Sequence, residues 1–195
     1  MPVSKSKLAV GLFIFSEANF FLILIVSYIY FHVVSAGGPS AGNSLNPLRT
    51  GLFSVALFAS SATMALAHHA FRHGRRRGLV IWLALTIVLG AIFLIGESFE
   101  WAGLFSRNIT VATNLFGSTF FTLTGFHGLH VFIGLCMLAI MLGVAGSGRM
   151  ALPQTPAMIE GEGLQAGFES VAMYWHFVDA VWVFIFGLVY LWPFF

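Results

Sequence analysis

The chain has 195 residues, of which 58% are hydrophobic and only 8% are charged. A soluble domain carries about 25% charged residues because its surface must be hydrated, so this composition excludes a soluble enzyme, a disordered tail and a nucleic-acid-binding module. The net charge of +2 reflects few charges and no basic patch, and the single cysteine, Cys136, excludes a disulfide framework and a thiolate metal cluster.

Five segments are long and apolar enough to cross a bilayer as helices, which takes roughly 20 mostly apolar residues each. In chain order we expect them at about residues 8–34, 51–71, 79–101, 114–145 and 167–192. The connections between them are too short to form a separate soluble domain. The sequence therefore predicts an all-α integral membrane protein, a bundle of five transmembrane helices that forms a single membrane domain over residues 1–195.

The cations predict the orientation of this bundle, because cytoplasmic loops are enriched in Lys and Arg. Seven of the nine cations fall on one side of the predicted spans: Lys5, Lys7, Arg72, Arg75, Arg76, Arg77 and Arg149. The other side holds Arg49 and Arg107. We therefore expect the N-terminus inside and the C-terminus outside.

Five of the seven acidic residues lie within the predicted spans: Glu17, Glu97, Glu100, Glu169 and Asp179. A charged group at the bilayer centre costs about 2.5–3.5 kcal/mol on insertion scales, so each needs a reason. Glu17 lies well inside its span with no cation nearby, and we expect its carboxyl to be protonated or held by hydrogen bonds. Glu17 is therefore a candidate proton-linked carboxyl, with a purely structural carboxyl as the alternative.

Glu97 and Glu100 are spaced i, i+3 near the outer end of the third span, so they share a helix face. Paired carboxylates invite a metal or acid–base interpretation. Without a histidine pattern on the same helix, an interfacial polar cluster that includes Arg107 is the better prediction.

Histidines within the spans raise the possibility of a haem. His127 and His130 share a face of the fourth span, and His176 and Asp179 share a face of the fifth. A membrane b-type cytochrome ligates haem through histidines on facing helices, but no second helix carries a spaced pair. Buried histidines that hydrogen-bond across helix contacts are the favoured interpretation.

Several motifs follow one another along the chain: FIFSEANFF around Glu17, LNPL at 45–48, AHH at 67–69, ESFEW at 97–101, GSTFFTLTGFHGLHVFIG at 117–134 and FESVAMYWHFVD at 168–179. Together they resemble subunit III of haem–copper respiratory oxidases, above all of cytochrome c oxidase. The resemblance covers the chain from about Leu8 to Trp192.

The resemblance implies that Glu17 matches the family's buried, carbodiimide-reactive glutamate. The other matching positions are Glu97, Glu100, His127, His130, His176 and Asp179. None of these ligates a metal in the family, so the resemblance implies no catalytic residue and no cofactor in this chain. Haem and copper are expected in subunits I and II.

The function implied is that of a non-redox accessory subunit. It packs beside subunit I, holds phospholipid and supports proton uptake, while the complex transfers electrons from cytochrome c to oxygen and pumps protons. The alternatives are subunit III of a ubiquinol oxidase, a homologue associated with nitric oxide reductase, and a stand-alone transporter.

Mitochondrial members of the family have seven helices, and this chain resembles their last five. The two further helices close one side of a lipid-filled cleft, a wall that extra helices of subunit I are expected to supply here. Five-helix forms occur in bacterial oxidases, so the resemblance implies a bacterial inner membrane.

Overall fold

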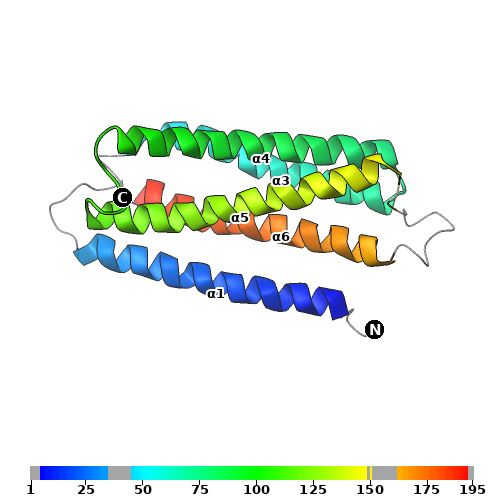
Figure 1. Cartoon of the computed structure of the whole chain (residues 1–195), viewed down its shortest axis with the longest axis horizontal. Coiled ribbons are helices and arrows are strands. Elements are labelled where there is room, and N and C mark those ends of the chain that lie inside the picture. The colour runs from blue at the N-terminus through cyan, green and yellow to red at the C-terminus, as the bar shows by residue number, and fades with distance from the viewer. Residues whose placement is uncertain (1–4, 35–44, 149, 151–161, 193–195) are drawn as a thin grey trace.

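The structure, a computed structural model, describes residues 5–34, 45–148, 150 and 162–192. Its helices are α1 (Lys5–Val34), α3 (Pro47–Arg72), α4 (Arg76–Phe105), α5 (Leu115–Gly146) and α6 (Glu162–Phe186), and α6 continues into a π-helical turn, η2 (Gly187–Leu191). They lie side by side, and successive helices run in opposite directions (Figure 1). Within the described part of the chain, five helices are long and apolar enough to cross a membrane. The predicted all-α bundle is confirmed.

Asparagine caps set where two of the helices begin. The Asn46 side chain accepts the backbone N–H of Arg49 at 3.2 Å, and Pro47 occupies the first helical turn, where its missing N–H is no loss. For this reason α3 starts upstream of the expected Gly51. Asn114 caps α5 in the same way, through the N–H of Gly117 at 2.6 Å.

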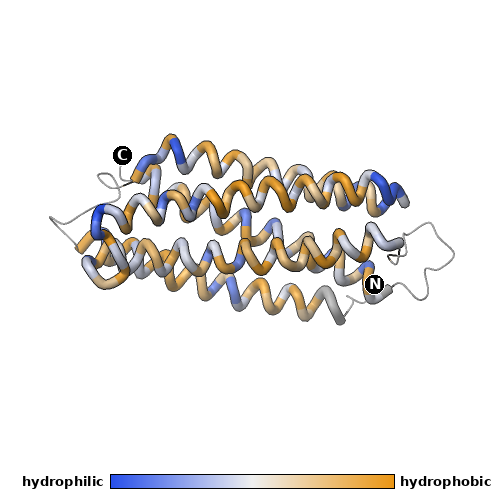
Figure 2. Tube along the Cα trace, turned by 45° about the horizontal axis from the view of Figure 1, so that its top comes forward, coloured by the Kyte–Doolittle hydropathy of each residue, from blue (hydrophilic) through white to orange (hydrophobic). Residues whose placement is uncertain are grey.

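Most hydrophilic residues gather near the two ends of the bundle (Figure 2). The arginines where α3 ends and α4 begins lie at the end of the bundle where α1 begins (Figure 1): Arg72, Arg75, Arg76 and Arg77. Arg49 and Arg107 belong to the opposite end, while Arg149 lies outside the described residues. The side of the membrane that each end faces stays a prediction.

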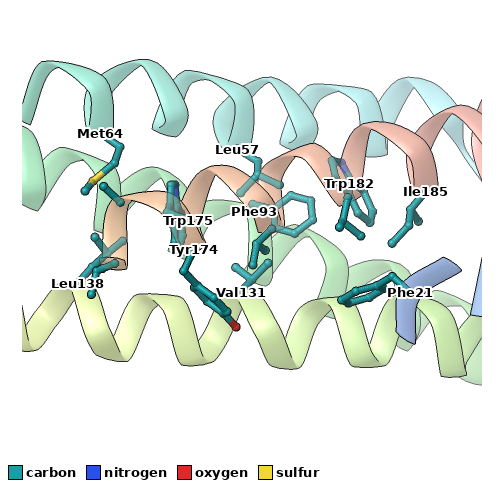
Figure 3. Close-up of a cluster of buried hydrophobic side chains, with 14 of the residues drawn as sticks. Phe21, Leu57, Met64, Phe93, Val131, Leu138, Tyr174, Trp175, Trp182 and Ile185 are labelled. Atoms are coloured by element: carbon teal, nitrogen blue, oxygen red, sulfur yellow. The ribbon is translucent and has the colours of Figure 1, made fainter. Parts of the chain in front are cut away.

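Helix α6 supplies the largest side chains of the core, which lie between it and the neighbouring helices (Figure 3). Trp175 and Trp182 are fully buried, and each indole N–H donates to a serine of α3. The distances are 3.0 Å from Trp175 to Ser60 Oγ and 2.8 Å from Trp182 to Ser54 Oγ. Each serine hydroxyl donates in turn to a carbonyl of its own helix, so its oxygen is free to accept.

Glycines let the backbones of α4 and α5 approach Trp175. A Cβ atom at Gly90 would lie 2.7 Å from the indole ring, and one at Gly134 would lie 2.9 Å from it. Membrane helix interfaces favour small residues because they bring backbones close together. The Trp175 ring therefore fits between α4 and α5 because neither helix has a side chain at these two positions.

Candidate functional site

The partly buried carboxyl of Glu17 on α1 meets a histidine of α5. Glu17 Oε2 lies 3.0 Å from His130 Nε2, and the two side chains are 22% and 11% exposed. The other ring nitrogen, His130 Nδ1, lies 2.7 Å from the carbonyl oxygen of Phe126 in its own helix. The deep position of Glu17 thus has a polar partner from another helix, which sequence reasoning had not identified.

The partners of His130 define where its protons are. A carbonyl oxygen can only accept, so Nδ1 carries a hydrogen and donates it to Phe126. Between Nε2 and Glu17 there is then one shared proton. Either the neutral acid donates to Nε2, or the imidazolium donates to the carboxylate, and both arrangements have no net charge.

This pair lies at the wall of a cavity of about 600 Å³ between α1, α5 and α6. Apart from the pair, most of the lining is apolar: Val10, Phe13, Phe20, Phe126, Leu129, Ile133, Met137 and Val171, with Ser16, Ser170 and Tyr174. The Tyr174 hydroxyl donates to the backbone carbonyl of His130 at 3.1 Å. The Phe21 ring packs edge-on to the imidazole, with ring centroids 4.9 Å apart. The arrangement holds a polar pair at the side of an apolar space.

Glu97 and Glu100 point to different neighbours despite their shared helix face. Glu100 accepts hydrogen bonds from Thr50 Oγ1 at 2.7 Å and from the Tyr190 hydroxyl at 2.5 Å. Glu97 is 7% exposed, and its Oε2 would lie 3.1 Å from a Cβ atom at Gly128. Neither oxygen of Glu97 has a hydrogen-bond partner among the described residues. The participation of Arg107 in a polar cluster stays a prediction.

His127 is enclosed by aromatic rings. Its ring stacks on Trp182 with centroids 4.8 Å apart and meets Phe93 edge-on at 5.9 Å. The side chain is fully buried, and neither ring nitrogen has a hydrogen-bond partner in the part of the chain that the structure describes. His127 and His130 therefore have different surroundings, although they are one turn apart.

His176 and Asp179 share a partner on α3. His176 Nδ1 lies 3.2 Å from Ser61 Oγ, and the Ser61 hydroxyl donates to Asp179 Oδ2. Asp179 is 8% exposed, whereas His176 is exposed and lines a groove with His68, Arg72 and Glu169. Nothing in the sequence singled out Ser61, because its role depends on how α3 is rotated against α6.

Over residues 5–34, 45–148, 150 and 162–192, no three His, Cys, Asp or Glu side chains come together in a group that could hold a metal ion. The acids and histidines named above are instead distributed over separate places: Glu17 and His130 at the α1–α5 contact, Glu97 and His127 between α4 and α5, Glu100 beside α3 and η2, and His176 and Asp179 at the α3–α6 contact.

Comparison with known proteins places this arrangement in a family. The family model described as cytochrome c oxidase subunit III matches residues 2–194. The chain is 36% identical over 200 residues to the cytochrome c oxidase subunit 3 proteins of Formosania lacustris and Cyprinus carpio. In each case the aligned residues cover 98% of this chain and 71% of the relative. It is 37% identical over 201 residues to that of Scyliorhinus canicula. The chain belongs to the cytochrome c oxidase subunit III family.

Proposed function

We propose that this chain packs beside subunit I of an oxidase that takes electrons from cytochrome c, holds phospholipid there and supports proton uptake from the inner side. Subunits I and II carry the haem and copper of this complex. Family membership favours this interpretation over a b-type cytochrome and over a stand-alone transporter. In this proposal the chain supports subunit I through packing, bound phospholipid and proton uptake, and it carries out no redox step of its own.

The observation that carries the proposal is the Glu17–His130 pair at the edge of the α1–α5–α6 cavity. An apolar cavity of about 600 Å³ that opens on the outer face of a membrane helix bundle suits the acyl chain of a lipid. A carboxyl and an imidazole that share one proton can pass it between them while the pair stays neutral, so the pair holds an exchangeable proton in the membrane without a lone charge. Lipid retention and proton exchange are thus assigned to one place.

The arginine-rich end of the bundle faces the inner side in this proposal, as the distribution of cations indicates. Protons for oxygen reduction are taken up from that side. Glu17 lies nearer to the arginine-rich end of α1 than to the other end, which suits a group that exchanges protons with the inner side. Localisation in a bacterial plasma membrane stays a prediction.

Purification of the affinity-tagged chain from its native membrane tests the proposal. We expect two larger subunits, haem and copper to co-purify, and we expect the material to oxidise reduced cytochrome c. A colourless preparation of the chain alone would overturn the proposal. Oxidation of a quinol with no oxidation of cytochrome c would reassign the complex to the ubiquinol oxidase branch.

A further inference from the structure

A polar groove lies where the outer surfaces of α3 and α6 meet. It has a volume of about 440 Å³, and its polar lining is contributed by both helices: His68 and Arg72 from α3, and Glu169 and His176 from α6. Such a surface contrasts with the exposed apolar side chains that cover most of the bundle. Glu169 and Arg72 continue the groove toward the arginine-rich end.

The position of His176 requires an explanation. It is exposed near the middle of the span Gly163–Leu191, where an ionisable side chain facing hydrocarbon is costly. Ionisable residues at this depth face the bundle interior or a water-filled cavity. A groove that has several polar side chains and is larger than several water molecules can hold water. The α3–α6 groove has polar side chains from both helices and a volume of about 440 Å³, so it can hold water beside His176.

Behind His176, the hydrogen bonds continue to a buried acid. His176 Nδ1 lies 3.2 Å from Ser61 Oγ, and Ser61 is bonded to Asp179 Oδ2. Asp179 is 8% exposed, and its second oxygen, Oδ1, has no hydrogen-bond partner among the described residues. Among the described residues, the hydrogen bond of this carboxyl therefore leads through Ser61 to the groove.

We propose that water in the α3–α6 groove exchanges protons with Asp179 through His176 and Ser61, so that this chain carries a second proton-binding site, separate from Glu17. In the first state, His176 Nδ1–H donates to Ser61, whose hydroxyl donates to the carboxylate of Asp179. Groove water then delivers a proton to Nε2. The Nδ1–H bond breaks as a new Oγ–H bond forms, and the old Oγ–H bond breaks as the proton joins Oδ2.

The second state has a neutral Asp179 that donates to Ser61, whose hydroxyl now donates to Nδ1 of a neutral His176. One proton has been taken from the groove and one has been added to the carboxylate. No electron is transferred and no further reactant is needed. The titratable and charged groups that line the groove beside His176 are His68 and Arg72 from α3 and Glu169 from α6.

Hydrogen–deuterium exchange of the Asp179 carboxyl tests the path. In the purified complex that contains the chain, the infrared carbonyl band of protonated Asp179 is identified as the band that Asp179→Asn removes, at a pH acidic enough for the band to appear. On transfer to D₂O, we expect this band to shift rapidly in the unmodified chain. In Ser61→Ala, where the connecting hydroxyl is missing, we expect the shift to be slower by about tenfold or more.

Two further variants separate the path from a general effect on folding. Ser61→Thr keeps a hydroxyl and should exchange nearly as fast as the unmodified chain. Ser98→Ala removes a hydroxyl that donates to the carbonyl of Leu94 in its own helix, and it should leave the rate unchanged. Equal rates in Ser61→Ala and the unmodified chain would overturn the proposal, as would slow exchange in the unmodified chain or the absence of the band at every pH. This readout does not involve Glu17 or its cavity, so its failure is distinguishable from that of the proposed function.

Discussion

Replacement of Gly134 by alanine tests whether Trp175 is fixed between α4, α5 and α6. The added Cβ atom would lie 2.9 Å from Trp175 Cε3 and 3.4 Å from Tyr174 Cε1. The first distance is too short for two carbon atoms, so the indole ring or a helix must shift. Overpacking of this kind costs about 1–3 kcal/mol, while alanine gains about 1 kcal/mol over glycine inside a helix.

The same helix offers a matched control. Gly143 also lies in α5, and no atom lies within 4 Å of a Cβ atom built there. Gly143→Ala therefore has the helix-propensity gain without the clash. We expect Gly134→Ala to lower the free energy of unfolding by up to about 2 kcal/mol, and Gly143→Ala to raise it by about 0.5–1 kcal/mol.

The assay is reversible unfolding of the purified chain in mixed detergent micelles, followed by helical circular dichroism as the fraction of denaturing detergent rises. If Gly134→Ala and Gly143→Ala have equal stabilities, the indole can move aside at little cost, and the tight packing argued for Trp175 is wrong. Partial recovery in the double variant Gly134→Ala/Trp175→Phe would identify the indole as the group that clashes.

Three further predictions concern polar contacts and orientation. Glu17→Gln should leave the chain in the purified complex, because the amide can still donate to a histidine nitrogen; loss of the chain on purification would make this residue structural. The hydroxyls of Thr63 and Thr86 join α3 to α4 at 2.8 Å, and a double-mutant cycle with valine at both positions should give a coupling of about 0.6 kcal/mol in detergent unfolding; a coupling of zero would contradict the contact. In a cysteine-free background, His73→Cys should react with a membrane-impermeant maleimide added from the inner side and Ser106→Cys with reagent added from the outer side. The reverse result would invert the proposed orientation.

The bundle could be predicted from the sequence because its signal is local. Each span is a long apolar run, and the cations lie near the helix ends or between the helices, so length and charge define five helices without knowledge of their packing. The boundary at Pro47 was missed because hydropathy does not register the cap that Asn46 provides. The positions of the helix ends depend on capping hydrogen bonds, which hydropathy and composition do not describe.

The partners of the buried acids could not be predicted, because they depend on helix rotation. Apolar residues surround most of these helices, so the sequence does not show which face meets which neighbour. Glu97 and Glu100 illustrate the limit. Residues three apart on a helix differ in direction by about 60°, and this difference turns Glu100 toward Thr50 while Glu97 lies over Gly128. A shared face therefore does not imply a shared site.

The two tryptophan–serine contacts have a consequence for the order in which the molecule forms. Trp175 and Trp182 are synthesised after α3, α4 and α5, yet they fill the space that those helices surround (Figure 3). Until α6 is made, Ser54 and Ser60 of α3 lack their indole partners. Because both contacts join α6 to α3, sliding one helix past the other by a turn would break both at once. Helix α6 thus fixes the register of α3, a helix that precedes it in the chain by two others.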